Sequence, residues 1–202
     1  MFRSSDPVAP STSRRRVVFV AVGAAIAALL AALVTAMVSG AFAAAVAPLA
    51  RSVPFSPSAE DGLIAAGEMV TLADDDVPAI ARLNPALREA MQDAETDAAV
   101  EALSFQITSG WRSPEYQEWL LQEAVDLYGS EEVARQFVAT PERSTHVTGD
   151  GIDIGPIDAQ FWLIEHGSRF GICQTYANER WHFELATVPG GVCPEMRADA
   201  AS

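Results

Sequence analysis

The sequence predicts an α+β domain, because helices and short strands are mixed along it without the regular order of βαβ units. Helix starts are indicated at Asn84-Pro85 and Ser113-Pro114, where an N-cap residue precedes a proline at the first helical position. Alternating apolar residues predict short strands at 104–108, 151–154 and 181–185. With no internal repeat visible, a single domain accounts for these elements.

The two strongest helices have clear limits. Leu87, Met91 and Ala94 lie three or four residues apart and are expected to form the buried face of the first helix. The second helix is expected to run to Tyr128 and to stop at Gly129, since glycine is common just past a helix C-terminus.

The other elements are shorter. In the first strand, Phe105 and Ile107 alternate onto one face. Ser130 is expected to cap a short helix, and Asp158 is expected to cap one that ends at Gly167.

The N-terminal quarter predicts a membrane segment ahead of this domain. Residues 1–16 are interpreted as a cytoplasmic tail that ends in three arginines, and residues 17–50 contain no charged residue. About 20 apolar residues span a bilayer, and a basic flank keeps its side in the cytoplasm. We therefore expect a single-pass anchor at 17–50, a proline-containing linker at 51–60, and an extracytoplasmic domain at 61–202.

A cleaved signal peptide is the alternative for the apolar segment. Residues 41–43 and 45–47 both have the A-x-A pattern of a cleavage site. Cleavage would give a secreted domain, whereas an intact anchor would give a cell-membrane protein. Residues 61–202 lie outside the cytoplasm in both cases.

Charge is divided unevenly along the chain. Residues 1–50 contain four arginines and one acid, whereas the remainder contains nine arginines and 26 acids, a net charge of −17. So acidic a surface argues against nucleic acid and anionic lipid as partners. Affinity for an anionic substrate has to come from groups close to the site.

Cys173 and Cys193 are the only two cysteines. In an oxidising compartment they predict a disulfide, with two buried thiols as the alternative.

Residue types suited to a catalytic zinc site occur at His146, Asp153 and His182. The apolar neighbours of Asp153 and of His182 alternate to the opposite strand face, so both side chains are expected to point away from the core. Gly149 and Gly151 allow a tight turn that brings His146 to the same point. By spacing alone, His146, Asp153 and His182 fit structural roles, such as hydrogen-bonded or turn residues, as well as they fit a zinc site.

A family resemblance adds to this pattern. Residues 144–153 read S-T-H-V-T-G-D-G-I-D and residues 179–182 read E-R-W-H. Together they resemble the S-x-H-x-x-G-x-(A/G)-x-D and E-x-W-H motifs of VanY-like D-alanyl-D-alanine carboxypeptidases, in the zinc DD-peptidase and hedgehog superfamily. Residues 109–113 with Gln117 resemble that family's S-G-Y-R-S-x-x-x-Q segment. The resemblance covers roughly 83–186 and departs at Trp111, where Tyr is usual, and at Gly151, where Ala is usual.

The resemblance implies a small antiparallel sheet flanked by helices and one Zn²⁺ bound by His146, Asp153 and His182. It implies Glu179 as the general base that assists attack by zinc-bound water. Arg112 resembles the family arginine that polarises the scissile carbonyl or holds a substrate carboxylate.

The same pattern bears on three further polar residues and on two tryptophans. Ser109, Gln117 and Ser144 are predicted to bind substrate, with support of the surrounding loop as the alternative. Trp111 and Trp181 are expected to pack in the core.

The implied function is removal of the terminal D-Ala from peptidoglycan stem peptides. An endopeptidase that cuts another stem bond is one alternative, because the same groups serve any amide. A non-catalytic, zinc-containing wall-binding module is the other, although a closed structural site would not need Glu179.

Overall fold

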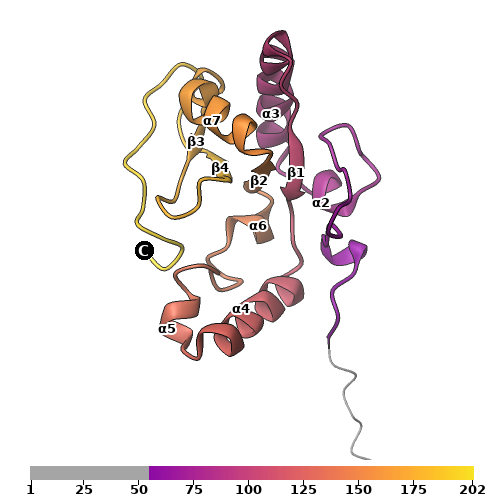
Figure 1. Cartoon of the computed structure of the whole chain (residues 1–202), viewed down its shortest axis with the longest axis vertical. Helices are drawn as coiled ribbons and strands as arrows, with labels where there is room; N and C mark the ends of the chain where they lie inside the picture. Colours follow the sequence, from indigo (N-terminus) through magenta and orange to yellow (C-terminus); the bar gives the residue numbers. More distant parts are fainter. Residues whose placement is uncertain (1–54) are drawn as a thin grey trace, which may run out of the picture. The chain divides into compact units, whose positions relative to one another are not determined.

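The computed structural model describes residues 55–202 (Figure 1). The predicted tail, the predicted anchor and residues 51–54 of the predicted linker lie outside these residues. Within residues 55–202, no helix has both the length and the apolar character needed to cross a membrane.

Helices and short strands are mixed without a regular order through the described part, as the sequence predicts. In chain order they are η2 (Ala59–Asp61), α2 (Pro78–Ala81), α3 (Pro85–Ala98), η3 (Ala99–Glu101), β1 (Gln106–Ser109), α4 (Pro114–Tyr128), α5 (Glu131–Ala134), α6 (Thr145–Thr148), β2 (Gly151–Gly155), α7 (Ile157–His166), η4 (Gly167–Phe170), β3 (Ile172–Gln174) and β4 (His182–Leu185).

The four strands form one antiparallel sheet in the order β1-β2-β4-β3. Helices α3 and α7 pack against one face of it (Figure 1). Ile107, Ile152, Ile154 and Phe183 are fully buried on that face. Strand alternation therefore turns Asp153, which lies between the two isoleucines of β2, toward the opposite face.

The helix limits follow the local signals in the sequence. The Asn84 side chain accepts a hydrogen bond from the Ala86 amide (3.0 Å), and the Ser113 hydroxyl accepts one from the Tyr116 amide (3.1 Å). Helix α4 ends at Gly129, whose φ of 68° lies in the left-handed region. These caps confirm the predicted starts of α3 and α4.

The predicted cap of α7 is wrong by two residues. The amides of Ala159 and Gln160 both bond to the Pro156 carbonyl, so helical hydrogen bonding begins at Pro156 and Asp158 lies inside the first turn. Sequence reasoning also missed α2, α6 and β3, each of which is only three or four residues long.

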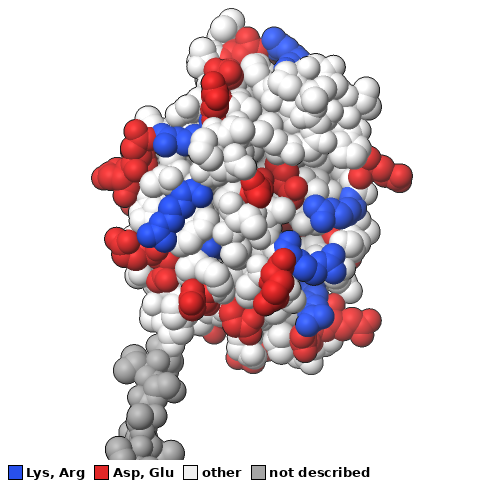
Figure 2. Space-filling view, turned by 180° about the vertical axis from the view of Figure 1, so that it is seen from behind, with Lys and Arg blue, Asp and Glu red and all other residues white. Residues whose placement is uncertain are grey.

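Cys173 and Cys193 form a disulfide, as predicted. Cys173 lies in β3, so the bridge attaches the segment that follows β4 to the outer strand of the sheet. On the face of the molecule in Figure 2, carboxylates occur around the whole outline, in agreement with the acidic composition.

Candidate metal centre and active site

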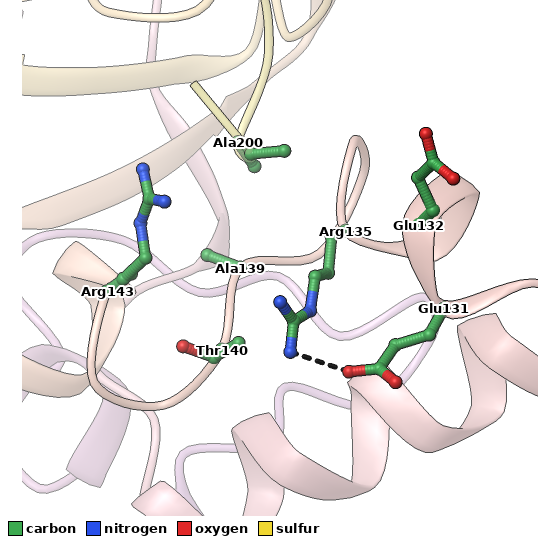
Figure 3. A pocket seen from close by; sticks show the side chains of 8 residues that line it. Glu131, Glu132, Arg135, Ala139, Thr140, Arg143 and Ala200 are labelled. Carbon is green, nitrogen blue, oxygen red and sulfur yellow. Dashed lines mark hydrogen bonds and ion pairs between the residues drawn. The ribbon is translucent and has the colours of Figure 1, made fainter.

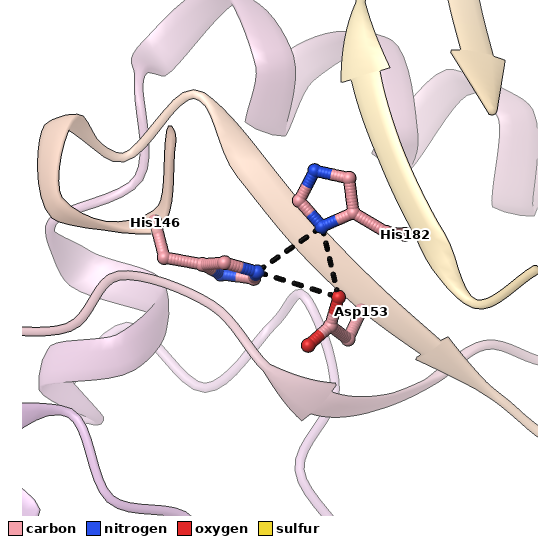
Figure 4. A group of neighbouring side chains, drawn as sticks. All are labelled: His146, Asp153 and His182. Carbon is pink, nitrogen blue, oxygen red and sulfur yellow. Dashed lines mark hydrogen bonds and ion pairs between the residues drawn. The ribbon is translucent and has the colours of Figure 1, made fainter. Parts of the chain in front are cut away.

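Three side chains direct ligand-type atoms to one point on the polar face of the sheet (Figure 4). His146 Nε2 lies 3.1 Å from His182 Nδ1, and Asp153 Oδ1 lies 3.4 Å from the first nitrogen and 3.1 Å from the second. All three residues are buried. The structure thus brings together the three residues that the sequence proposed as metal ligands.

Strand register explains two of these positions. Asp153 of β2 and His182 of β4 are direct cross-strand partners, so their side chains emerge side by side on one face. His146 comes from the short helix α6, which ends at Gly149 with a φ of 78°. That left-handed turn returns the chain to β2, as the sequence predicted.

The outer nitrogen of each imidazole has its own acceptor. His146 Nδ1 lies 2.8 Å from the Gly110 carbonyl, and His182 Nε2 lies 3.0 Å from Glu184 Oε1. Hydrogen bonds from these nitrogens select, in each neutral ring, the tautomer whose converging nitrogen has a lone pair for a metal. Two lone pairs and a carboxylate oxygen at one point fit a divalent cation of the zinc type.

Arg112 lies beside this triad in a fixed orientation. Its Nη2 donates to Asp153 Oδ2 (3.0 Å), its Nη1 to Gln117 Oε1 (3.0 Å) and its Nε to Ser109 Oγ (2.8 Å). Gln117 is itself held by the Ala139 carbonyl (2.8 Å). The structure therefore places the predicted substrate residues Ser109 and Gln117 against Arg112, where they position its guanidinium.

Glu179 combines burial with an unsatisfied oxygen. The residue is 8% exposed, and its Oε1 is buried without a hydrogen-bond partner among residues 55–202. Burial raises the pKa of this carboxyl to about 7. Such a group can accept a proton near neutral pH and return it within the same reaction cycle.

A cavity of about 70 Å³ joins these groups. Residues from several elements line it: Arg112, Gln117, Phe137, Val138, Ala139, Ser144, Thr145, His146, Asp153, Tyr176, Glu179, Trp181, His182 and Ala200. We call it the metal cavity.

Comparison with known proteins agrees with this arrangement. A family model described as VanY, D-alanyl-D-alanine carboxypeptidase, matches residues 80–187, which is more than half of the chain. The chain belongs to the VanY family. This membership confirms the resemblance seen in the sequence and the prediction of a peptidase.

Several solved structures are similar to this VanY-family chain. A mutant vancomycin-resistance D,D-pentapeptidase VanY from the VanB-type resistance cassette, in complex with Zn(II), is 24% identical; the match covers 61% of this chain and 82% of that chain, with a TM-score of 0.49. VanYB in complex with D-alanine-D-alanine is 23% identical over 60% and 80% of the two chains, with a TM-score of 0.49. The L,D-carboxypeptidase DacB from Streptococcus pneumoniae is 23% identical over 54% and 67%, with a TM-score of 0.42. No match was found among curated proteins.

The electrostatics of the VanY-type triad suit a cation. Burial alone would raise the pKa of Asp153, but the charges and hydrogen bonds of His146, His182 and Arg112 hold it well below its usual range. Burial, with Arg112 beside it, lowers the pKa of His146. Burial also lowers the pKa of His182, but Asp153 and Glu184 outweigh it and raise the value to about 9. A metal that binds at His182 therefore displaces a proton.

Thr145 and Glu184 were not recognised from the sequence as site residues. The Thr145 hydroxyl donates to Glu184 Oε1 (3.1 Å), the same oxygen that faces His182. The signal was present, because Glu184 lies two residues after His182 and so on the same face of the strand. Gly151 leaves room for this arrangement, since a Cβ there would lie 2.5 Å from Thr145 Oγ1 and 2.7 Å from His182 Cε1.

The two tryptophans differ in their surroundings. Trp111 Nε1 donates to the Val147 carbonyl (3.1 Å), and Arg82 lies over its ring at 4.3 Å. The expectation of core packing is wrong for Trp181, which is 42% exposed and lines the metal cavity. Ser144 is buried and also lines the cavity.

Proposed function

We propose that the chain is a zinc-dependent carboxypeptidase that removes the terminal D-Ala from peptidoglycan stem peptides. The observation that carries the proposal is the convergence of His146 Nε2, His182 Nδ1 and Asp153 Oδ1, with the outer nitrogen of each ring committed to an acceptor. Three protein ligands of this kind leave an open position, which is typical of catalytic zinc and not of structural zinc.

Zinc bound by these residues would lower the pKa of a water in that open position and polarise the scissile carbonyl. The chain supplies the remaining chemistry. Glu179 Oε1 accepts a proton from the attacking water and returns it to the leaving amine. Its pKa of about 7 suits both transfers.

Arg112 supplies the positive charge that the acidic domain otherwise lacks at the site. Three of its five N–H groups are used by Ser109, Gln117 and Asp153, which leaves two for substrate. A guanidinium held in this way binds the scissile carbonyl oxygen or the terminal carboxylate without reorganising.

Replacement of Glu179 by Ala tests the catalytic assignment. The mutant is expected to bind about one equivalent of zinc and to lose hydrolysis, because Glu179 is not a ligand. His146→Ala is the matched control and is expected to lose metal and activity together. Wild-type turnover by the Glu179 mutant would refute the assignment of Glu179 as the base. Zinc-loaded wild type that hydrolyses no stem peptide would instead favour the non-catalytic wall-binding module.

The bond that is cut separates a carboxypeptidase from an endopeptidase. Mass spectrometry of purified stem peptides after digestion is expected to show loss of one terminal D-Ala. Amidation of the substrate's C-terminus is expected to weaken turnover by about tenfold if Arg112 binds that carboxylate, with Arg112→Lys giving a similar loss. Equal cleavage of free and amidated peptides would favour an endopeptidase.

We also propose that residues 17–50 anchor the domain outside the cytoplasmic membrane. Support comes from the uncharged run and the three preceding arginines. Full-length protein is expected in the membrane fraction with its N-terminus intact. A soluble form that starts after residue 43 or 47 would instead establish a signal peptide.

A further inference from the structure

A second and larger hollow adjoins the metal cavity. It has a volume of about 490 Å³ and is lined by Arg135, Arg143, Thr140, Ala139, Ala200 and Glu131, among others. Figure 3 shows Arg143 and Arg135 on either side of Ala139 and Thr140, with the Arg135 side chain directed toward Glu131. Ala139 and Ala200 also line the metal cavity, so the two hollows share a wall. We call the larger one the arginine pocket.

The metal cavity is much smaller than the arginine pocket, and this difference in volume indicates where a peptide substrate must lie. Ligand pockets usually measure about 300–1,000 Å³, whereas the metal cavity measures about 70 Å³. It can receive the atoms around the scissile bond but not a longer peptide. The rest of the substrate has to extend along the surface, and the arginine pocket is large enough to receive it.

The arginine pocket is lined by two arginines and by two carboxylates, Glu131 and Glu132, and the two arginines differ in their ion pairing. Arg135 is neutralised by Glu131, four residues earlier on the same turn of chain, with Nη2 and Oε1 2.6 Å apart. Arg143 makes no ion pair with an Asp or Glu side chain among residues 55–202. Its Nη2 donates to the main-chain oxygen of Ser202, the last residue of the sequence (2.6 Å), so one of its donors is already used by the chain itself. A guanidinium has five N–H groups, so most of its donors are available to a ligand.

A pair of arginines in one pocket is unusual on so acidic a domain. Residues 51–202 contain nine arginines against 26 acids, yet two of the arginines lie in one pocket beside the metal cavity. Because long-range attraction for anions is lacking, a carboxylate would be recognised here only by direct contact. Arg143 can provide that contact in a two-pronged geometry.

We propose that the arginine pocket is a substrate subsite in which Arg143 binds a carboxylate carried by the stem peptide outside the cleaved D-Ala-D-Ala unit. The inference rests on the proposed function. A γ-linked glutamate or a diamino dicarboxylic acid has the required chemistry. Arg143 acts on binding and does not touch the reacting atoms, so its loss should raise KM and leave kcat little changed.

The test uses the full chain with zinc and two pentapeptides that end in D-Ala-D-Ala. The peptides differ only in that the upstream carboxylate is free in one and amidated in the other. Arg143→Gln is expected to lower kcat/KM for the free acid by about tenfold more than for the amide, through KM. Arg143→Lys should recover part of the loss. Arg169→Gln is the control, because Arg169 is exposed and paired with Asp97 of α3, away from both cavities.

Two results would overturn the inference. One is an equal effect of Arg143→Gln on both peptides, and the other is no effect on either. If no peptide is cleaved by the wild type, the proposed function fails instead. Calorimetric binding of the same two peptides to zinc-loaded wild type and Arg143→Gln then tests the subsite alone: a preference for the free acid that depends on Arg143 upholds it, and the lack of one rejects it.

Discussion

Glu184 offers the sharpest test of how the metal site is built. Its Oε1 is the acceptor for His182 Nε2 (3.0 Å) and for the Thr145 hydroxyl (3.1 Å), and Arg197 lies 3.6 Å away. Burial would raise its pKa, but these partners lower it below the usual value. Glu184 is therefore ionised at neutral pH and accepts the Nε2 proton of His182, so that Nδ1 is the nitrogen that binds a metal once the metal displaces its proton.

Two substitutions separate the charge of Glu184 from its hydrogen bond. In Glu184→Gln the amide oxygen can still accept from His182, and only the negative charge is lost. In Glu184→Ala both are lost, and the ring can rotate. Partners of metal-bound histidines typically contribute about 10- to 100-fold in metal affinity. We expect Glu184→Gln to weaken zinc binding about 10-fold, or about 1.4 kcal/mol, and Glu184→Ala to weaken it about 100-fold, or about 2.7 kcal/mol.

Zinc affinity can be measured by competition with a chromogenic chelator. The kcat for a D-Ala-D-Ala peptide can be measured at saturating zinc. Glu165→Gln is the control, because Glu165 is exposed on α7. With zinc saturating, both Glu184 variants should keep most of the wild-type kcat, since Glu184 acts only through His182.

Unchanged zinc affinity in Glu184→Ala would refute this reasoning. Loss of kcat at full zinc occupancy, as large as that of Glu179→Ala, would also contradict it, because Glu184 would then take part in the reaction itself.

Three further predictions concern pH and stability. The acid limb of kcat/KM should have its midpoint at or below about 7, because Glu179 must be ionised and a nearby metal ion can only lower its pKa of about 7; a midpoint well above that value in a pH-rate profile would exclude Glu179 as the base. In metal-free protein, folding raises the pKa of Glu179 from 4.5 to about 7. Ionisation of Glu179 therefore lowers the free energy of unfolding progressively as the pH rises from 4.5 to about 7, and by its full amount above about pH 7. Denaturant unfolding should thus show Glu179→Gln to be more stable than wild type at pH 8 but not at pH 4, and equal differences at both would contradict the assigned pKa. Replacing Cys173 and Cys193 by Ser should lower the free energy of unfolding by about 3 kcal/mol in urea titrations, and no loss would show that the bridge does not contribute to stability.

Local signals in the sequence were enough for much of the fold. Caps at Asn84 and Ser113 and the stop at Gly129 act within a few residues, so they can be read without the tertiary structure. The face of Asp153 and His182 follows from the two-residue period of a strand. The sequence could not supply the register that makes these two residues direct partners, although it motivated the assumption that their strands are neighbours.

Contacts between distant segments were beyond sequence reasoning. Arg112 donates to Asp153, which lies 41 residues later, and no local signal predicts that contact. The arginine pocket combines residues near 131–143 with Ala200, some 60 positions later. No periodicity or spacing connects such segments.

The two oxygens of Asp153 face different partners. Oδ1 belongs to the metal triad, and Oδ2 accepts from Arg112 Nη2 at 3.0 Å. If the proposed function holds, one rigid, planar carboxylate would set the distance between a bound metal ion and the guanidinium of Arg112. A metal ion of larger radius would tilt this carboxylate and carry the guanidinium with it. Metal replacement in this chain should consequently alter which substrates are accepted, and not merely how fast they react.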